Sequence, residues 1–193
     1  MAGLADIHVS SEVVARARAG EAGACEALYR AVAPATLTLI RRLVGQRTLA
    51  EDLFQDTMMI MFERLPQFRA EAPLGAWLRQ IALSRCLMYL RSPWRRARLC
   101  LEPIDTAVTA EVAALVTPSY RSELIDLERA LASLAPTARA VVWLYEVEGY
   151  SHQEIAQAFG RSISFSKSQL ARAHARLRHC LQPEEHPPPC TLI

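Results

Sequence analysis

The chain has 193 residues, of which 51% are hydrophobic and 22% are charged, and its net charge is +2. This composition supports packed cores and excludes wholesale disorder. Because the charge is nearly balanced, the chain is not a globally basic nucleic-acid-binding protein. Any nucleic-acid site must therefore come from local segregation of charge.

Cysteine usage and hydropathy narrow the function classes further. The five cysteines contain no C-x-x-C pair, which argues against a disulfide framework and against a zinc site. We therefore expect no metal and no other cofactor. The sequence shows no signal peptide and no apolar run long enough to span a bilayer, so we expect a cytoplasmic protein without membrane insertion.

The first half of the chain predicts helices. Residues 11–19 and 21–44 predict two of them, separated by Gly20. In residues 49–68, apolar residues recur at spacings of three and four, as in an amphipathic helix. Its core stripe is Phe54, Met58, Met61 and Leu65, and its opposite face carries Asp52, Gln55, Asp56, Met59 and Glu63. That face is either a solvated surface or a docking surface for a basic partner, and the pattern alone favours the solvated surface.

Another helix is predicted after a loop at residues 67–72, and it begins at Pro73, which suits a first helical turn. Its expected core residues are Leu74, Trp77, Leu78, Ile81 and Met88, and its expected outward residues are Arg79, Gln80, Ser84 and Arg85. The segment at its end, RSPWRRAR, holds four arginines beside Trp94. Cations beside an aromatic ring suit single-stranded nucleic acid, whereas compensation of the helix dipole explains one or two of the arginines.

The sequence changes character at residues 99–121, where prolines and acidic residues replace helical periodicity, so we expect a flexible linker. A new core begins near Ser122 with the stripe Leu124, Leu127, Leu131 and Leu134. Pro136 begins the next helix, which ends at Gly149. The Pro-rich residues 182–193 are expected to be disordered. No segment alternates as a strand does, so the predicted class is all-α.

A helix-turn-helix is predicted after Gly149. Ser151 and Glu154 form an S-x-x-E capping box, and Gly160 lies where a helix would end in a left-handed residue. Ser162 caps the second helix, which runs to about Leu181 with the apolar stripe Ile163, Leu170, Leu177 and Leu181. Because this helix carries several arginines and no acid, the pattern favours binding to a polyanion in a major groove. An ordinary basic helical hairpin is the alternative.

The order of these segments resembles the extracytoplasmic-function (ECF) group of bacterial RNA polymerase sigma factors. The segments ALYRAVAP, AEDLFQDTMMIMFERLPQFR and PLGAWLRQIALSRCLMYLRS are similar to a sigma-2 domain. The segment from LASLAPTARAVVWLYEVEGYSHQEIAQAFG to the end of the second helix is similar to a sigma-4 domain. The resemblance implies a sigma-2-like domain at 1–98, a linker at 99–121 and a sigma-4-like domain at 122–181.

The resemblance also implies functional residues. The docking face for core RNA polymerase is expected to include Asp52, Leu53, Gln55 and Asp56. Residues expected to bind the melted −10 promoter element are Phe68, Arg69, Trp77, Arg79, Gln80, Ser84 and Arg85. Residues expected to read the duplex −35 element are Ser164, Phe165, Lys167, Ser168, Arg172 and Arg176. The partners implied are core RNA polymerase, promoter DNA and an anti-sigma factor.

The function that the resemblance implies is that of a transcription initiation factor, which is not itself an enzyme. A free-standing helix-turn-helix repressor or activator is the alternative, but it leaves the acidic helix unexplained. The segment from Ile163 to Leu170 departs from the family pattern, because Phe165 replaces a small polar residue and Ser166 replaces a core valine. Phe165 either contacts DNA or fills the space beside Ser166, and we favour contact with DNA.

Overall fold

The computed structural model describes residues 4–92 and 127–181, and within these ranges the chain forms helices joined by short turns, with no strand. The predicted all-α class is confirmed. The elements are η1 (Leu4–Asp6), α1 (Ser11–Arg18), α2 (Ala22–Val44), α3 (Arg47–Arg64), η2 (Leu65–Gln67), α4 (Leu74–Arg91), α8 (Pro136–Val142), η3 (Trp143–Val147), α9 (His152–Phe159) and α10 (Ile163–Leu181). The predicted linker and tail, and the arginines after Pro93, lie outside the described residues.

The elements η1 to α4 form a first unit around one apolar core. Leu28 and Ile40 of α2, Met61 of α3, and Leu78 and Leu83 of α4 are each 0–1% exposed. These side chains recur at helical spacing on the inner face of each helix, so their burial is the main stabilising term of the unit.

One predicted core residue of α4 is wrong, because Met88 is 52% exposed. The apolar stripe of α4 continues instead through Leu83, Cys86 and Leu90, which are all buried. Met88 lies two positions from Cys86 and from Leu90, and two residues turn an α-helix by about 200°, so Met88 points away from the core.

The elements α8 to η3 and α9 to α10 form a second unit, preceded by helical residues at 127–132. Leu144 and Ile155 are fully buried in it. The predicted capping box is present: Ser151 Oγ accepts from the backbone N–H of Glu154, and the Glu154 carboxylate accepts from the N–H of Ser151. Gly160 ends α9 with a φ of 61°, and the N–H of Phe165 donates to Ser162 Oγ (3.3 Å) at the start of α10.

The predicted apolar stripe of α10 is partly wrong. Its buried residues are Ser166, Leu170 and Ala173, with Leu177 packed beside them. Ile163 and Leu181 are 45% and 43% exposed, because they are the terminal residues of α10, where fewer neighbours lie alongside.

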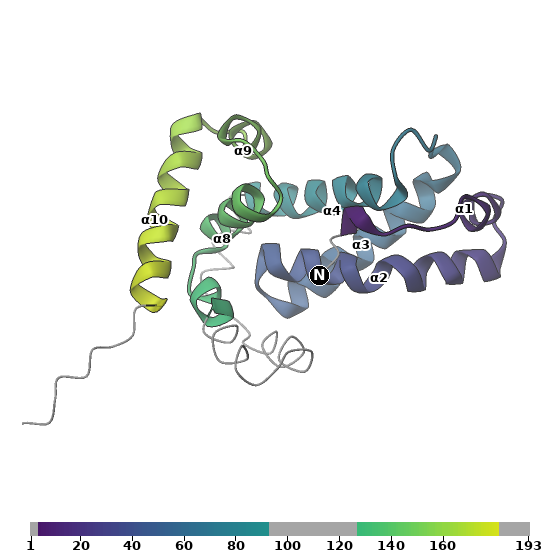
Figure 1. Cartoon of the computed structure of the whole chain (residues 1–193), viewed down its shortest axis with the longest axis horizontal. Coiled ribbons are helices and arrows are strands. Elements are labelled where there is room, and N and C mark those ends of the chain that lie inside the picture. Colours follow the sequence, from purple (N-terminus) through teal and green to yellow (C-terminus); the bar gives the residue numbers. More distant parts are fainter. Residues whose placement is uncertain (1–3, 93–126, 182–193) are drawn as a thin grey trace, which may run out of the picture.

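The two units pack against each other. Figure 1 shows α8, α9 and α10 gathered at one end of the α2–α4 bundle, with α10 on the outside. Contacts join α8 to α2 and α9 to α4. At the first of these, buried Arg139 of α8 donates through Nε to the carbonyl oxygen of Arg42 in α2 (2.9 Å). The Arg42 guanidinium in turn lies 4.9 Å from the Trp143 ring centroid.

Candidate nucleic-acid and partner interfaces

The outer face of α3 is acidic and has an exposed apolar centre. Asp52 and Gln55 are exposed, and Asp56 is half-buried. Met59 lies among them and is 71% exposed, more than any other large hydrophobic side chain described. An apolar centre with a charged rim is the usual make-up of a protein interface. Leu53, which was expected on this face, is 4% exposed, so it belongs to the core that holds α3 in place.

Asp56 is shared between the acidic face and α4. Its carboxylate accepts a hydrogen bond from Arg85 Nη2, and the side chains of this pair are 47% and 27% exposed. Arg85 was expected to contact DNA, but in the structure its guanidinium is already committed to α3. Ser84, the preceding residue, is exposed.

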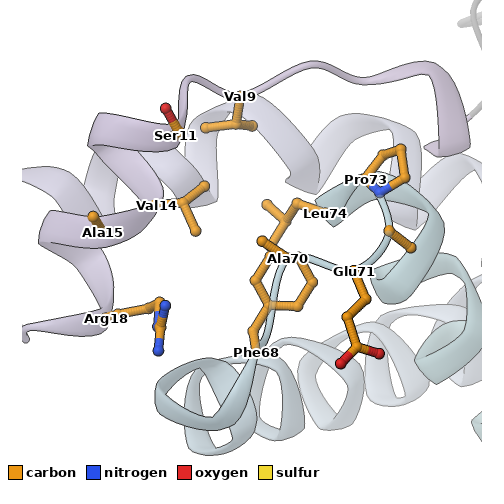
Figure 2. Close-up of a pocket in the computed structure, with 11 residues that line it drawn as sticks. Val9, Ser11, Val14, Ala15, Arg18, Phe68, Ala70, Glu71, Pro73 and Leu74 are labelled. Carbon is orange, nitrogen blue, oxygen red and sulfur yellow. The ribbon is translucent and has the colours of Figure 1, made fainter.

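A pocket of about 450 Å³ opens between α1 and the loop that joins η2 to α4. Figure 2 shows Val14, Ala15 and Arg18 of α1 on one side of it and Phe68 and the loop on the other. The lining is Val9, Ser11, Val14, Ala15, Arg18, Phe68, Ala70, Glu71, Ala72, Pro73 and Leu74. An apolar hollow with a polar rim is suited to an aromatic ligand such as a nucleic-acid base.

The expected −10 residues around this loop differ in position. Phe68 is 6% exposed and its ring lies 5.0 Å from that of Trp77, so this pair forms the wall between the loop and α4. Arg69 is exposed and lies 3.8 Å from Glu71 at the loop surface. The loop therefore offers an exposed cation, paired with Glu71, beside an aromatic wall.

Arg79 and Gln80 of α4 contact a segment of the second unit. Arg79 Nε donates to the carboxylate of Glu148, and Gln80 Nε2 donates to the Tyr150 hydroxyl (3.4 Å). The structure thus brings together residues separated by about seventy positions, which no local sequence pattern could indicate.

The outer face of α10 is basic, and the sequence from Ile163 to Leu181 contains no acid. Ser164, Lys167, Arg172 and Arg176 are exposed, and Ser168 is half-buried. Arg172 lies back along its own helix, where Nε donates to the carbonyl oxygen of Ser168 (3.2 Å). Arg176 Nε donates to Ser133 Oγ (3.2 Å), so this arginine also ties α10 to the segment before α8.

Phe165 is turned inward, contrary to our preference for a DNA-facing ring. Its ring packs at 5.8 Å from that of Phe159 and against the core. Ser166 is fully buried and its hydroxyl lies 3.0 Å from His152 Nδ1.

The contribution of α1 to the pocket was not predicted from the sequence. Val14 and Arg18 were predicted only as part of a short helix, yet they line the side opposite Phe68. Arg18 Nη2 also donates to the carbonyl oxygen of Pro66 (3.2 Å), which joins α1 to η2. The basic residue Arg18 in this helix was the only sequence feature that pointed to a contact with the loop.

Cys86 is enclosed in the first unit, and burial raises the pKa of its thiol to about 12, so the group stays protonated at neutral pH. Within residues 4–92 and 127–181, no three His, Cys, Asp or Glu side chains gather as a metal site. No helix in the same ranges is both long enough and apolar enough to cross a bilayer.

Comparison with known proteins gives the same two units. Residues 28–96 match the family model for Sigma-70 region 2, and residues 124–177 match that for Sigma-70, region 4. The sigma factor RpoE of Bartonella quintana, solved in complex with the anti-sigma factor NepR, has a similar fold. That likeness has a TM-score of 0.51 and 24% identity, and it covers 82% of this chain and 97% of RpoE.

Three relatives show the extent of the sequence similarity. The ECF RNA polymerase sigma factor SigM of Mycobacterium tuberculosis is 30% identical over 172 residues, which cover 89% of this chain and 84% of SigM. The RNA polymerase sigma factor CarQ of Myxococcus xanthus is 32% identical over 167 residues, which cover 86% of this chain and 94% of CarQ. "Probable RNA polymerase sigma factor RfaY" of Xanthomonas campestris is 28% identical over 166 residues, and that match spans only 41% of its length. With both regions matched in order and an ECF relative covered along most of its length, this chain belongs to the extracytoplasmic-function family of RNA polymerase sigma factors, which are transcription initiation factors.

Proposed function

We propose that this chain binds core RNA polymerase, directs it to promoters by reading a −35 and a −10 element, and aids promoter melting. The chain acts in the cytoplasm, where transcription takes place, and it works by binding alone, since the polymerase performs the chemistry. The observation that carries the proposal is the placement of an acidic face and a basic face on separate units of one chain. α3 carries the acidic face, and α10 carries the basic face.

The acidic face of α3 is the proposed docking surface for the polymerase. Asp52, Gln55 and Asp56 provide its charge and hydrogen-bonding groups, and Met59 provides the apolar centre. Opposite charges across an interface guide association and fix its register. A basic surface on the polymerase is therefore the partner that this face fits.

The loop at residues 68–73 and the adjoining face of α4 form the proposed site for the melted −10 strand. The pocket beside Phe68 takes an extruded base, and Arg69, Trp77, Arg79, Gln80 and Ser84 serve the strand around it. Extruding a base is least costly where the duplex is already melted. The site thereby stabilises the melted strand over the closed duplex.

The proposal also includes an anti-sigma factor as the regulator of this chain, because most members of the family are held inactive by one. The alternative, a free-standing helix-turn-helix repressor or activator that would use α10 alone, is not favoured by the similarity of both units to sigma factors. A gel-shift assay on duplex promoter DNA, with and without core polymerase, separates the two. A sigma factor binds weakly without the polymerase, whereas strong binding by the chain alone would favour the repressor.

Replacing Arg172 tests the role of α10. We expect Arg172→Ala to weaken promoter binding by the holoenzyme, because the exposed guanidinium can leave Ser168 to reach DNA. Loss of a base contact costs about 1–3 kcal/mol and relaxes preference at one base pair. Loss of a phosphate contact instead weakens all sequences and lowers the salt slope by about one unit.

The matched control for Arg172 is Arg30→Ala. Arg30 is an exposed arginine on α2 that pairs with Glu26, so the control removes the same charge far from α10. Filter binding across a salt series measures affinity and slope together. Equal behaviour of the two variants would remove Arg172 from the DNA interface.

A further inference from the structure

One contact between the units is made by a loop of three residues, Glu148, Gly149 and Tyr150, which we name the 148–150 loop. Glu148 accepts from Arg79 Nε, and its backbone carbonyl accepts from Arg79 Nη2 (3.3 Å). The two side chains are only 13% and 18% exposed. This ion pair is therefore shielded from solvent, which makes it stronger than a surface pair.

The same loop also contacts Arg79 and Gln80 through Tyr150. The Arg79 guanidinium carbon lies 5.4 Å from the Tyr150 ring centroid, and the Tyr150 hydroxyl accepts from Gln80. Hydrogen bonds within the second unit hold the loop in this conformation. The Tyr150 N–H donates to the Leu144 carbonyl (2.9 Å). Trp143 Nε1 also donates to the Glu148 carboxylate (3.1 Å). These hydrogen bonds within the second unit fix the conformation of the loop.

The groups that contact Arg79 resemble the two parts of a nucleotide, its phosphate and its base. The carboxylate of Glu148 presents an anion to the guanidinium, as a phosphate does. The Tyr150 ring presents an aromatic face to the same guanidinium, as a base does. One loop thus supplies both kinds of group that single-stranded DNA would bring to Arg79.

A second contact fixes the same arrangement of the units from another side. Arg139 is 4% exposed and joins α8 to the last turns of α2 through the Arg42 carbonyl. Glu128, whose side chain is 14% exposed, lies 4.0 Å from Arg139 and offsets part of the cost of burying its charge. The 148–150 loop is therefore brought to α4 by packing that does not depend on the loop itself.

We propose that the 148–150 loop is an internal mimic of a nucleotide, which covers Arg79 and contacts the exposed Gln80 in the free chain, and which must leave α4 before the −10 strand can bind. This inference rests on the proposed role of α4 in binding that strand. In the free chain, the loop therefore blocks the access of single-stranded DNA to Arg79. Docking on the polymerase, which must place the two units at separate promoter elements, moves the loop away from α4.

The test compares Glu148→Gln with Glu146→Gln. Both changes remove one negative charge from the same short segment, but Glu146 pairs with His174 of α10 (3.0 Å), within the second unit. Fluorescence anisotropy measures binding of the full chain to a short labelled single-stranded DNA of random sequence. We expect Glu148→Gln to bind about tenfold more tightly than wild type, as loss of one charge-assisted hydrogen bond predicts. Glu146→Gln should match wild type within about twofold.

Two further measurements separate the possible failures. Thermal melting by circular dichroism shows whether both variants are folded. With saturating core polymerase, Glu148→Gln and wild type should transcribe equally, because the loop has then left α4 in both. Equal DNA affinity of the two variants would overturn the inference. If wild type still transcribed with core polymerase in that case, the proposed function would stand without it.

Discussion

Lysine at positions 52 and 56 is expected to prevent the chain from assembling with core RNA polymerase. Asp52 and Asp56 supply the charge of the α3 face, around the exposed side chain of Met59. Setting like charges against each other across an interface costs several kcal/mol, so the two reversals should reduce affinity by several orders of magnitude. Titration of labelled chain with purified core enzyme measures the effect.

The control for this prediction must account for Arg85. Because Asp56 pairs with Arg85 inside the first unit, part of any effect of Asp56→Lys could come from α4. Asp52→Lys alone avoids this pair and should still weaken assembly. Glu12→Lys with Glu26→Lys reverses two exposed acids on α1 and α2 and should leave assembly unchanged. Wild-type affinity in the Asp52→Lys, Asp56→Lys variant would refute the docking surface.

Gly75→Ala is expected to destabilise the first unit more than any other single methyl addition at its glycines. A Cβ at Gly75 would lie 2.2 Å from the carbonyl oxygen of Leu4, and backbone cannot give way as a flexible side chain does. η1 would have to leave the start of α4, exposing Leu4, which is 5% exposed. Overpacking of this kind typically costs about 1–3 kcal/mol. Chemical denaturation followed by circular dichroism gives the change in unfolding free energy.

Gly23→Ala is the matched control for Gly75→Ala. Gly23 also lies near the start of a helix, but a Cβ there would meet nothing closer than 4.0 Å. Alanine is favoured over glycine in a helix, so Gly23→Ala should leave stability equal or slightly higher. The two substitutions are chemically identical and should move stability in opposite directions. A Gly75→Ala chain as stable as wild type would show that η1 does not rest on α4.

Local signals in the sequence predicted the second unit well where backbone chemistry sets the structure. The capping box at Ser151 and Glu154 and the left-handed residue at Gly160 depend on a few neighbouring positions, so their residue types are sufficient evidence. The acidic face of α3 was also visible, since a helix of known start fixes which residues share a side.

The direction of a side chain was harder to predict where it depends on residues from another helix. Phe165 turned inward to pack on Phe159, a contact that exists only after α9 and α10 pack. Met88 is 52% exposed because, among residues 4–92 and 127–181, no element covers that side of α4. The Arg79–Glu148 pair joins two units, and periodicity within either unit carries no information about it.

Transcription by purified core polymerase tests the central claim most directly. Core enzyme is mixed with this chain and with fragments of genomic DNA from the native host, and the RNA products are sequenced. We predict transcripts that need both proteins and that start at fixed distances from a shared pair of upstream elements. Transcripts identical to those of core enzyme alone, together with tight binding of the chain by itself to duplex DNA, would contradict the assignment as an initiation factor.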